Sequence, residues 1–359
     1  MKIAILHNYM DNIGGAEIVD FILARELKAD IYTTNIDPKK IKKMGFNTHN
    51  ILSIGKIPIN APFKQEFAYQ KFKKLKLKDY DLYIIAGDWA MSASINNKPN
   101  IWYIYSPIRE IWDLYEYTRE NNVPFYAKPI FDLWVKHHRR INKKNIKHIN
   151  KFISISDTVK ERIKKYLNKN SIVINPPVET SKYYYQKTGN FWLSVNRLIN
   201  HKRVDLQMKA FSKMPKERLI LVGSYEQSKH FKSYTDYIRK IKPKNVEILS
   251  WVDQKQLRDL YANCKGFITT SKDEDFGMTP VEAMASGKPV IAPKEGGYKE
   301  TVTDKTGILI EDIDSDKLTK IIKQFKNPEA YKKECIKQAK KFDTKIFIKK
   351  IKKEIKNVL

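Results

Sequence analysis

Short apolar runs recur along most of the chain and are separated by longer, more polar stretches. They occupy residues 1–8, 30–34, 81–86, 101–105, 151–156 and 171–178, and then 191–195, 219–223, 246–250, 266–271 and 289–292. Continuous apolar runs of this length are typical of strands that are buried on both faces of a sheet. With helices between them, they predict an α/β protein built on parallel strands.

A proline pair and a polar segment divide the chain. Pro176 and Pro177 end one apolar run, and a polar stretch follows up to Asn190, which indicates a domain boundary. A chain of 359 residues is long enough for two domains. The expected parts are a first domain 1–180, a linker 181–190, a second domain 191–340 and a last helical segment 341–359. Residues from Asp314 onward read as three helices, and the last carries an apolar stripe of Ile346, Phe347, Ile351 and Ile355.

One stretch of the second domain has the pattern of an anion site. After the run 266–271 comes a polar loop with Glu274, and then a helix for which Thr279 is the expected N-cap. The free N–H groups at this helix start are those of Gly277, Met278 and Thr279, and together with the helix dipole they favour a negative charge. Glu274 in the loop and Glu282 in the helix can accept hydrogen bonds from hydroxyls. The stretch therefore predicts binding of a phosphate-linked sugar.

The same residues resemble a known family. Glu274 and Glu282 form an E-x7-E motif within EDFGMTPVEAMASGKPVIA, and GGYKETV follows. Together with the SISD and NPPVET stretches, this sequence resembles glycosyltransferase family 4, in particular its mannosyltransferase-like branch. The resemblance implies the GT-B fold, in which an acceptor-side and a nucleotide-sugar-binding Rossmann-like domain face each other. It also implies that segment 341–359 packs back on the first domain.

The resemblance assigns roles to further residues. Arg197 and Lys202 follow the run 191–195 and match an R-x4-K signature. In this signature the planar guanidinium of the arginine and the ammonium of the lysine neutralise a diphosphate. The implied enzyme is a retaining hexosyltransferase that needs no protein nucleophile. In it, Glu282 would hold the ribose and Glu274 the sugar hydroxyls. GDP-mannose is the first expected donor, followed by UDP-glucose or UDP-N-acetylglucosamine.

The candidate site residues fall into three groups. The catalytic candidates are Glu274, Arg197 and Lys202. The donor-binding candidates are Gly14, Gly15, Arg197, Lys202, Trp251, Val252, Glu274, Phe276, Gly277, Met278, Thr279 and Glu282. On the acceptor side we expect Tyr105, which stands where the family pattern has a histidine, and Arg109.

No metal ion and no other cofactor is expected. Asp273-x-Asp275 matches the D-x-D pattern of metal-dependent glycosyltransferases. Three other places in the chain match it equally well, beginning at Asp79, Asp312 and Asp314, so the pattern indicates nothing here. Arg197 and Lys202 can supply the positive charge that a metal ion would bring.

The charge of the chain predicts an acidic partner. Lys and Arg number 68 against 40 Asp and Glu, a formal net charge of +28. The stretch 63–78 places Phe63, Phe67 and Phe72 near one helical face among six lysines, which fits either an anionic membrane surface or an ordinary half-buried helix. The basic stretch 136–151 is interpreted as a solvated face. A basic nucleic-acid-binding protein is the non-enzyme alternative, but without a nucleic-acid motif we expect no nucleic acid partner.

The expected location is cytoplasmic. The first apolar run is too short for the core of a signal peptide, and no run approaches the about 18 residues of a membrane span. The protein would be soluble or peripheral on the cytoplasmic membrane face. The expected partners are thus a nucleotide sugar, a glycan or lipid-linked acceptor and, through 63–78, an anionic membrane surface.

Overall fold

The chain folds into two compact units. We describe a computed structural model that covers residues 1–60, 63–223, 229–250 and 252–359. One unit comprises Met1–Asn175 together with Phe347–Leu359, and the other comprises Pro176–Ile346. The first segment of the first unit therefore ends at Asn175, whereas the sequence placed this boundary at residue 180. Residues 181–190, the expected linker, belong to the second unit.

The first unit is built on a parallel sheet whose described strands have the order β3-β2-β1-β4-β5-β6-β7. The strands are β1 (Ile3–Tyr9), β2 (Asp30–Thr34), β3 (Ile51–Ser53), β4 (Leu82–Ile85), β5 (Asn100–Ile104), β6 (Lys151–Ser154) and β7 (Ile172–Val173). The central strand β1 pairs Ile5 with Ile31 on one side and with Ile84 on the other. Continuous burial of β1, β4 and β5 explains why these segments are almost uninterrupted apolar runs.

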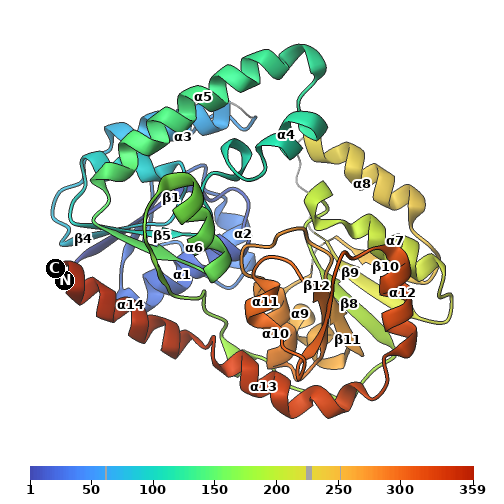
Figure 1. Ribbon diagram of the computed structural model, residues 1–359. Coiled ribbons are helices and arrows are strands. Elements are labelled where there is room, and N and C mark those ends of the chain that lie inside the picture. The colour runs from blue at the N-terminus through green and yellow to red at the C-terminus, as the bar shows by residue number, and fades with distance from the viewer. Residues whose placement is uncertain (61–62, 224–228, 251) are drawn as a thin grey trace. The chain divides into compact units, whose positions relative to one another are not determined.

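Helices cover both faces of this sheet, α3 and α5 on one side and α1 and α14 on the other (Figure 1). The helices of the unit are α1 (Gly15–Leu27), α2 (Pro38–Lys43), α3 (Phe63–Lys74), α4 (Tyr115–Asn122), α5 (Lys128–Asn145), α6 (Asp157–Arg162) and α14 (Thr344–Val358). In α14 the ring of Phe347 contacts Tyr103 of β5, and Glu354 forms an ion pair with Lys151. The buried stripe of α14 includes Ile348, whereas Ile346, which the sequence assigned to it, is 41% exposed.

The second unit repeats the arrangement. Its described strands have the order β10-β9-β8-β11-β12-β13 and are all parallel. They are β8 (Phe191–Val195), β9 (Arg218–Val222), β10 (Val246–Leu249), β11 (Gly266–Ile268), β12 (Val290–Pro293) and β13 (Gly307–Ile310). The helices are α7 (Val204–Ser212), α8 (Lys229–Ile241), α9 (Gln254–Asn263), α10 (Met278–Ala285), α11 (Tyr298–Thr301), α12 (Ser315–Gln324) and α13 (Lys332–Lys340).

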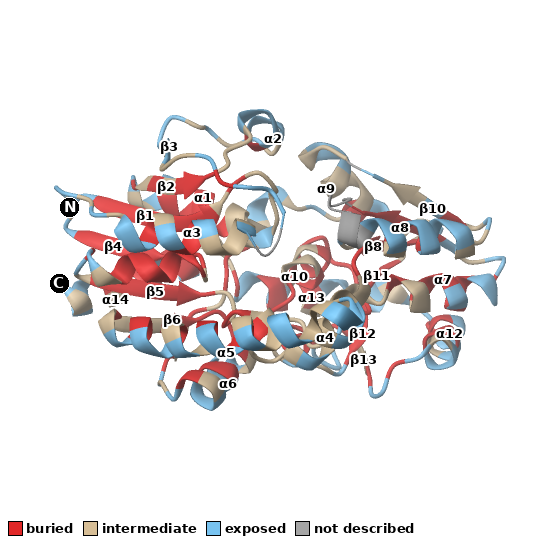
Figure 2. Ribbon diagram, turned by 90° about the horizontal axis from the view of Figure 1, so that it is seen from above, coloured by how far each residue is buried: buried red, intermediate tan, exposed pale blue. Residues whose placement is uncertain are grey.

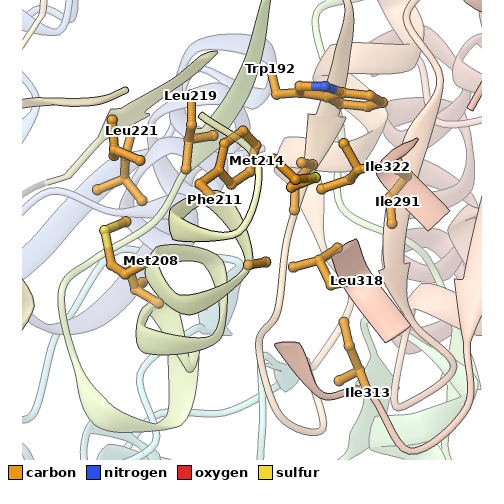
Figure 3. Packing of buried hydrophobic residues seen from close by; sticks show 14 of the residues in the cluster. Trp192, Met208, Phe211, Met214, Leu219, Leu221, Ile291, Ile313, Leu318 and Ile322 are labelled. Atoms are coloured by element: carbon orange, nitrogen blue, oxygen red, sulfur yellow. The ribbon is translucent and has the colours of Figure 1, made fainter. Parts of the chain in front are cut away.

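Large apolar side chains fill the space between this sheet and helices α7 and α12. Trp192 of β8, Phe211 of α7 and Ile322 of α12 are almost completely buried and belong to one cluster (Figure 3). Figure 2 shows the same division in both units: the central strands are buried, and the outer sides of the helices are exposed. Burial of this kind is the main favourable contribution to folding.

The structure confirms the predicted fold class, an α/β protein with two parallel sheets, and changes some details. The sequence did not predict β3 and β13, which are only three and four residues long. The N-cap of α6 is Ser156, whose hydroxyl accepts from the Val159 N–H at 3.0 Å; the sequence favoured Asp157. The three predicted helices after Asp314 are present as α12, α13 and α14.

The strand order determines where a ligand would bind. Each sheet has a topological switch point, where the strand order changes direction. It lies between β1 and β4 in the first sheet and between β8 and β11 in the second sheet. Ligands of doubly wound sheets bind outside the carboxyl ends of the strands at this switch point. The loops after β8 and β11 carry the predicted Lys202 and Glu274.

Replacement of Phe211 by alanine should destabilise the second unit. The ring is fully buried in the apolar cluster, so its removal leaves a cavity and should cost roughly 3–5 kcal/mol. Urea unfolding followed by circular dichroism measures the effect. Tyr237→Ala, at a position of α8 that is 41% exposed, is the control and should change stability by less than about 1 kcal/mol. Equal losses in both variants would contradict the assignment of Phe211 to the core.

Candidate functional site

An ion pair joins two predicted site residues at the switch point of the second sheet. The ammonium of Lys202 lies 2.6 Å from Oε2 of Glu274. Lys202 ends a short 3-10 turn (Asn200–Lys202) after β8, and Glu274 lies in the loop after β11. Parallel pairing of β8 with β11 places both loops at the same sheet edge. The fold therefore brings together the two residues that the sequence assigned to the diphosphate and to the sugar.

The ion pair determines the charge of Glu274. Burial would raise the pKa of this carboxyl, but the adjacent Lys202 ammonium outweighs burial and lowers the pKa to about 2. The carboxylate is therefore ionised at any ordinary working pH. An ionised carboxylate only accepts hydrogen bonds, which suits it to the hydroxyls of a sugar.

Arg203 and Glu295 hold the two loops in place. Arg203 donates from Nε to the Thr270 carbonyl at 2.7 Å and from Nη2 to both carboxylate oxygens of Glu295 at 3.0 Å. Glu295 also accepts from the Asp273 N–H at 3.2 Å. The sequence analysis missed both residues. The only local signal is that Arg203 follows Lys202, and nothing near Glu295 indicates which residue it contacts.

Two backbone contacts complete the attachment of these loops. The hydroxyl of Thr270 donates to the Lys202 carbonyl at 2.8 Å, and the Lys272 N–H donates to the His201 carbonyl at 2.8 Å. The Lys202 turn and the Glu274 loop are therefore linked directly as well as through Arg203. A site held in this way needs little rearrangement when a ligand arrives.

Helix α10 begins beside Glu274. Its N-cap is Gly277, with φ +89°, and not the predicted Thr279, which lies within the first turn. A Cβ at Gly277 would lie 2.7 Å from the ring of Tyr298, so both the backbone angle and the space require glycine. Met278 and Thr279 are partly exposed in the first turn. Phe276 is buried with its ring 5.3 Å from that of Phe342, so its side chain belongs to the core.

The paired glycines of the GGYKETV stretch support the same loop. The Gly297 N–H donates to the Glu274 carbonyl at 2.7 Å. At Gly296, with φ +53°, a Cβ would lie 2.3 Å from that carbonyl oxygen. The close approach of this turn thus fixes the backbone of Glu274, while Tyr298 donates to its carboxylate at 3.3 Å.

The second glutamate of the E-x7-E motif is held by tyrosines. Tyr261 donates to Oε2 of Glu282 at 2.7 Å. Burial raises the pKa of Glu282, and the hydroxyls of Tyr261 and Tyr183 oppose the rise only in part. Glu282 is partly exposed on α10, so the carboxyl can still meet a ligand hydroxyl.

The other donor-side candidates lie around these two loops. Arg197 is exposed two residues after the end of β8. Val252 is partly buried between β10 and α9. Trp251 lies outside the described residues.

In the first unit, a buried charge cluster holds the predicted Gly14–Gly15 turn. Gly14 is the N-cap of α1, and its N–H donates to Oε2 of Glu17 at 2.7 Å. The other oxygen of Glu17 lies 3.1 Å from Nε2 of His7, and Nδ1 of His7 lies 2.6 Å from Asp20. Burial would lower the pKa of His7, but the Asp20 and Glu17 carboxylates raise it to about 10. His7 is therefore a cation that fixes two carboxylates of α1.

The acceptor-side candidates are engaged within the first unit. The hydroxyl of Tyr105 donates to Asp20 at 2.7 Å and to the Ala16 carbonyl at 3.0 Å. Arg109 donates from Nε and Nη2 to one oxygen of Asp113, at 2.9 and 2.7 Å. Tyr105 thus joins the charge cluster under the Gly14 turn.

Two further carboxyls at the edge of the first sheet were missed by the sequence analysis. Asp88 follows β4, and Glu110 follows β5. Burial and the charge of Asp88 raise the pKa of Glu110 to about 7. Burial also raises the pKa of Asp88, although Asn8 donates to this carboxyl. Acids of perturbed pKa at strand ends are candidates for ligand binding.

The structure corrects the predicted face of the 63–78 stretch. Helix α3 ends at Lys74 and buries Phe72 completely, whereas Phe63 and Phe67 are 62% and 49% exposed. The five residues from Phe67 to Phe72 advance about 140° around the helix, so the two rings cannot share a side. Lys64 forms an ion pair with Asp11 at 2.9 Å. This helix is therefore half-buried and partly neutralised.

Two observations concern metal ions and membranes. Among the described residues, no three His, Cys, Asp or Glu side chains gather as a metal ion would require. No helix in the described part of the chain is long and apolar enough to cross a membrane.

Comparison with known proteins links this site to a family. Residues 178–342, which include Lys202, Glu274 and Glu282, match the model described as glycosyl transferases group 1. An uncharacterized glycosyltransferase of Methanocaldococcus jannaschii is 29% identical over 196 residues, 54% of this chain and 55% of that protein. An alpha-1,3/1,6-mannosyltransferase of Dictyostelium discoideum is 33% identical over 159 residues, 38% and 37% of the two chains. The matched parts thus span about half or less of these two relatives.

Solved structures show the fold over nearly the whole chain. HepE of Anabaena in complex with UDP-glucose superimposes with a TM-score of 0.76 at 18% identity, covering 99% of this chain and 100% of that one. A sucrose-phosphate synthase from Thermosynechococcus elongatus gives a TM-score of 0.76 at 15% identity, covering 99% and 98%. The two-unit α/β architecture is that of these proteins.

Glu110→Gln should stabilise the protein at neutral and alkaline pH, but not at acidic pH. The folded pKa of about 7 lies above the ordinary 4.5, so the fold disfavours the ionised form. The destabilisation grows as pH rises from 4.5 to 7 and is complete above 7. Glutamine removes it, for a gain of roughly 1–2 kcal/mol at pH 8.5 after solvent screening, and little at pH 5. Thermal unfolding at both pH values measures this, with exposed Glu116→Gln as control. A gain that does not depend on pH would contradict it.

Proposed function

We propose that the protein is a retaining glycosyltransferase that moves a hexose from a nucleotide sugar to an acceptor hydroxyl. The observation that carries the proposal is the Lys202–Glu274 ion pair at the switch point of the second sheet. A cation for a diphosphate and a carboxylate for sugar hydroxyls lie side by side there. The match of residues 178–342 to glycosyl transferases group 1 supports the same activity.

Each group of the site has a task in this reaction. The bond from the anomeric carbon to the diphosphate breaks, a bond to the acceptor oxygen forms, and the acceptor proton leaves with the nucleoside diphosphate. Lys202, Arg197 and the N-terminus of α10 stabilise the charge that develops on the diphosphate. Glu274 orients the sugar through its hydroxyls, and Glu282 binds the ribose.

GDP-mannose is the first donor we propose. Several similar proteins are named mannosyltransferases, including an O-antigen chain mannosyltransferase of Salmonella typhimurium that is 25% identical over 246 residues. A UDP sugar is the alternative, because the Anabaena protein of the same fold binds UDP-glucose. The acceptor is a glycan or lipid-linked glycan, and the carboxyls of Asp88 and Glu110 are suited to accept hydrogen bonds from its hydroxyls.

The two glutamates should affect donor use in different ways. Glu282→Ala removes the ribose contact, so it should weaken nucleotide binding. Glu274→Ala should lower turnover more than nucleotide affinity, because its partner is the sugar. A thermal-shift panel of GDP, UDP, ADP and their sugars identifies the donor that the wild type binds. A ligand at a hundredfold excess over its Kd should stabilise the folded protein by about 2.7 kcal/mol. Kinetics with that donor then separate kcat from KM for the variants.

Exposed Glu247→Ala is the matched control, since this residue lies on the edge strand β10 and is paired with Arg218. It should leave binding and turnover unchanged. Unchanged kinetics in both Glu274→Ala and Glu282→Ala would overturn the proposed roles, and no stabilisation by any nucleotide would overturn the proposed function.

Transfer should proceed without a divalent metal ion. Lys202 and Arg197 supply the positive charge that a metal ion would bring to the diphosphate, so full activity is expected in excess EDTA. Lys202→Ala should reduce turnover, and manganese should not restore it; exposed Lys299→Ala is the control. Activity that disappears with EDTA and returns with manganese would refute this prediction.

A further inference from the structure

A ridge on the first unit exposes large apolar side chains to water. Phe125 and Tyr126, in a 3-10 turn (Phe125–Ala127), are 82% and 72% exposed. Ile130 and Leu133, in the first turns of α5, are 71% and 69% exposed. Soluble proteins rarely gather such side chains on the surface unless they bind a partner. We call these four residues the apolar tip.

The same side of α5 becomes basic beyond Leu133. Its exposed basic side chains, together with Lys147 in the 3-10 turn that follows, form the basic shank: Lys136, His137, Arg140, Lys143, Lys144 and Lys147. Residues 133, 137, 140 and 144 follow the three- and four-residue spacing of one helical face. Among the described residues, the structure gives Lys136, Arg140 and Lys144 no acidic partner.

The opposite side of α5 is anchored in the unit. Val135 and His138 are buried, and Nε2 of His138 lies 3.1 Å from Glu66 of α3. The ring of His138 also contacts Trp89 and Trp134. Because the inner face is fixed, α5 presents the tip and the shank to solvent, and it cannot roll over to hide them.

Most acidic side chains near the tip are neutralised. Glu120 pairs with Lys128 and Arg119, and Asp132 pairs with Arg119 as well. Glu116 of α4 is exposed. The surface is therefore neutral and apolar at one end and strongly positive at the other.

We propose that the apolar tip and the basic shank dock the first unit on an anionic lipid bilayer. A bilayer offers the matching chemistry in the matching order, with an apolar layer a few ångströms below negatively charged headgroups. The tip enters the acyl boundary, and the shank remains at the headgroups. The α5 helix has 18 residues, about 27 Å, so its two halves reach both layers when the helix is tilted.

This surface differs from the 63–78 stretch, in which the sequence placed the candidate contact with an anionic membrane. In α3, Phe72 is buried, Lys64 pairs with Asp11, and Lys71 donates to the Ile54 carbonyl at 3.2 Å. Helix α3 therefore has fewer apolar and basic side chains that could contact lipid. The proposal does not depend on the proposed transfer reaction.

Vesicle flotation of the full chain tests the proposal. One set of vesicles is pure phosphatidylcholine, and the other is an equimolar mixture of phosphatidylcholine and phosphatidylglycerol. Binding to each is measured at low and at high salt. The shank variant carries Lys136→Gln, Arg140→Gln, Lys143→Gln and Lys144→Gln. It should bind the anionic vesicles about tenfold or more weakly. The tip variant carries Phe125→Ser, Tyr126→Ser, Ile130→Gln and Leu133→Gln. It should bind at low salt but detach at high salt, where the wild type stays bound, because apolar insertion is not screened.

Two matched controls make the result specific. Lys320→Gln, Lys323→Gln, Lys326→Gln and Lys333→Gln together remove the same charge from exposed positions of the second unit and should change binding much less. Phe63→Ser with Phe67→Ser tests α3 and should retain salt-resistant binding. All substituted side chains are exposed, so circular dichroism should show each variant folded.

Three outcomes would overturn the proposal. In the first, the shank variant and its charge-matched control lose binding equally. In the second, salt-resistant binding depends on Phe63 and Phe67 and not on the tip. In the third, the wild type does not bind anionic vesicles. If it then forms a dimer in analytical ultracentrifugation that the tip variant does not form, the apolar tip is a self-association surface instead.

Discussion

The 2.6 Å ion pair between Lys202 and Glu274 is the contact around which the loops after β8 and β11 are arranged. A partly buried ion pair adds little net stability, because both charges lose water. Its neighbours nevertheless fix both ends: Arg203 and Glu295 connect the loops, and the close turn at Gly296 holds the Glu274 backbone. So much support for a weakly stabilising pair is understandable if the pair acts on a ligand.

The two sheets use the same geometry with opposite electrostatics. Each has its polar groups at the carboxyl ends of the strands that flank the switch point. In the second unit a cation lowers the pKa of Glu274, which keeps the carboxylate charged. In the first unit burial and the neighbouring Asp88 raise the pKa of Glu110, which brings its titration close to neutral pH. One sheet thus offers a fixed charge pair suited to a diphosphate sugar, and the other offers carboxyls suited to hydroxyls.

Helix α5 packs on the first unit with one side and presents an exposed surface with the other. Its inner positions, such as Val135 and His138, hold it on the first unit, while its outer positions change from apolar to basic along its length. A lysine count alone cannot distinguish such a surface from a solvated face. The distinction depends on which apolar side chains remain exposed after packing, and Phe125 and Leu133 remain exposed whereas Phe72 of α3 does not.

The sequence by itself determined most strands, the two parallel sheets and most helices, because buried strands need apolar runs and these are local. It also proposed Lys202, Glu274 and Glu282 as site candidates, since their motifs lie within short segments. Only the tertiary structure decided that Lys202 and Glu274, which are 72 residues apart, form an ion pair, and that Arg203 contacts Glu295. Such contacts follow from the strand order, which brings distant loops to one edge, and the local spacing of residues does not encode that order.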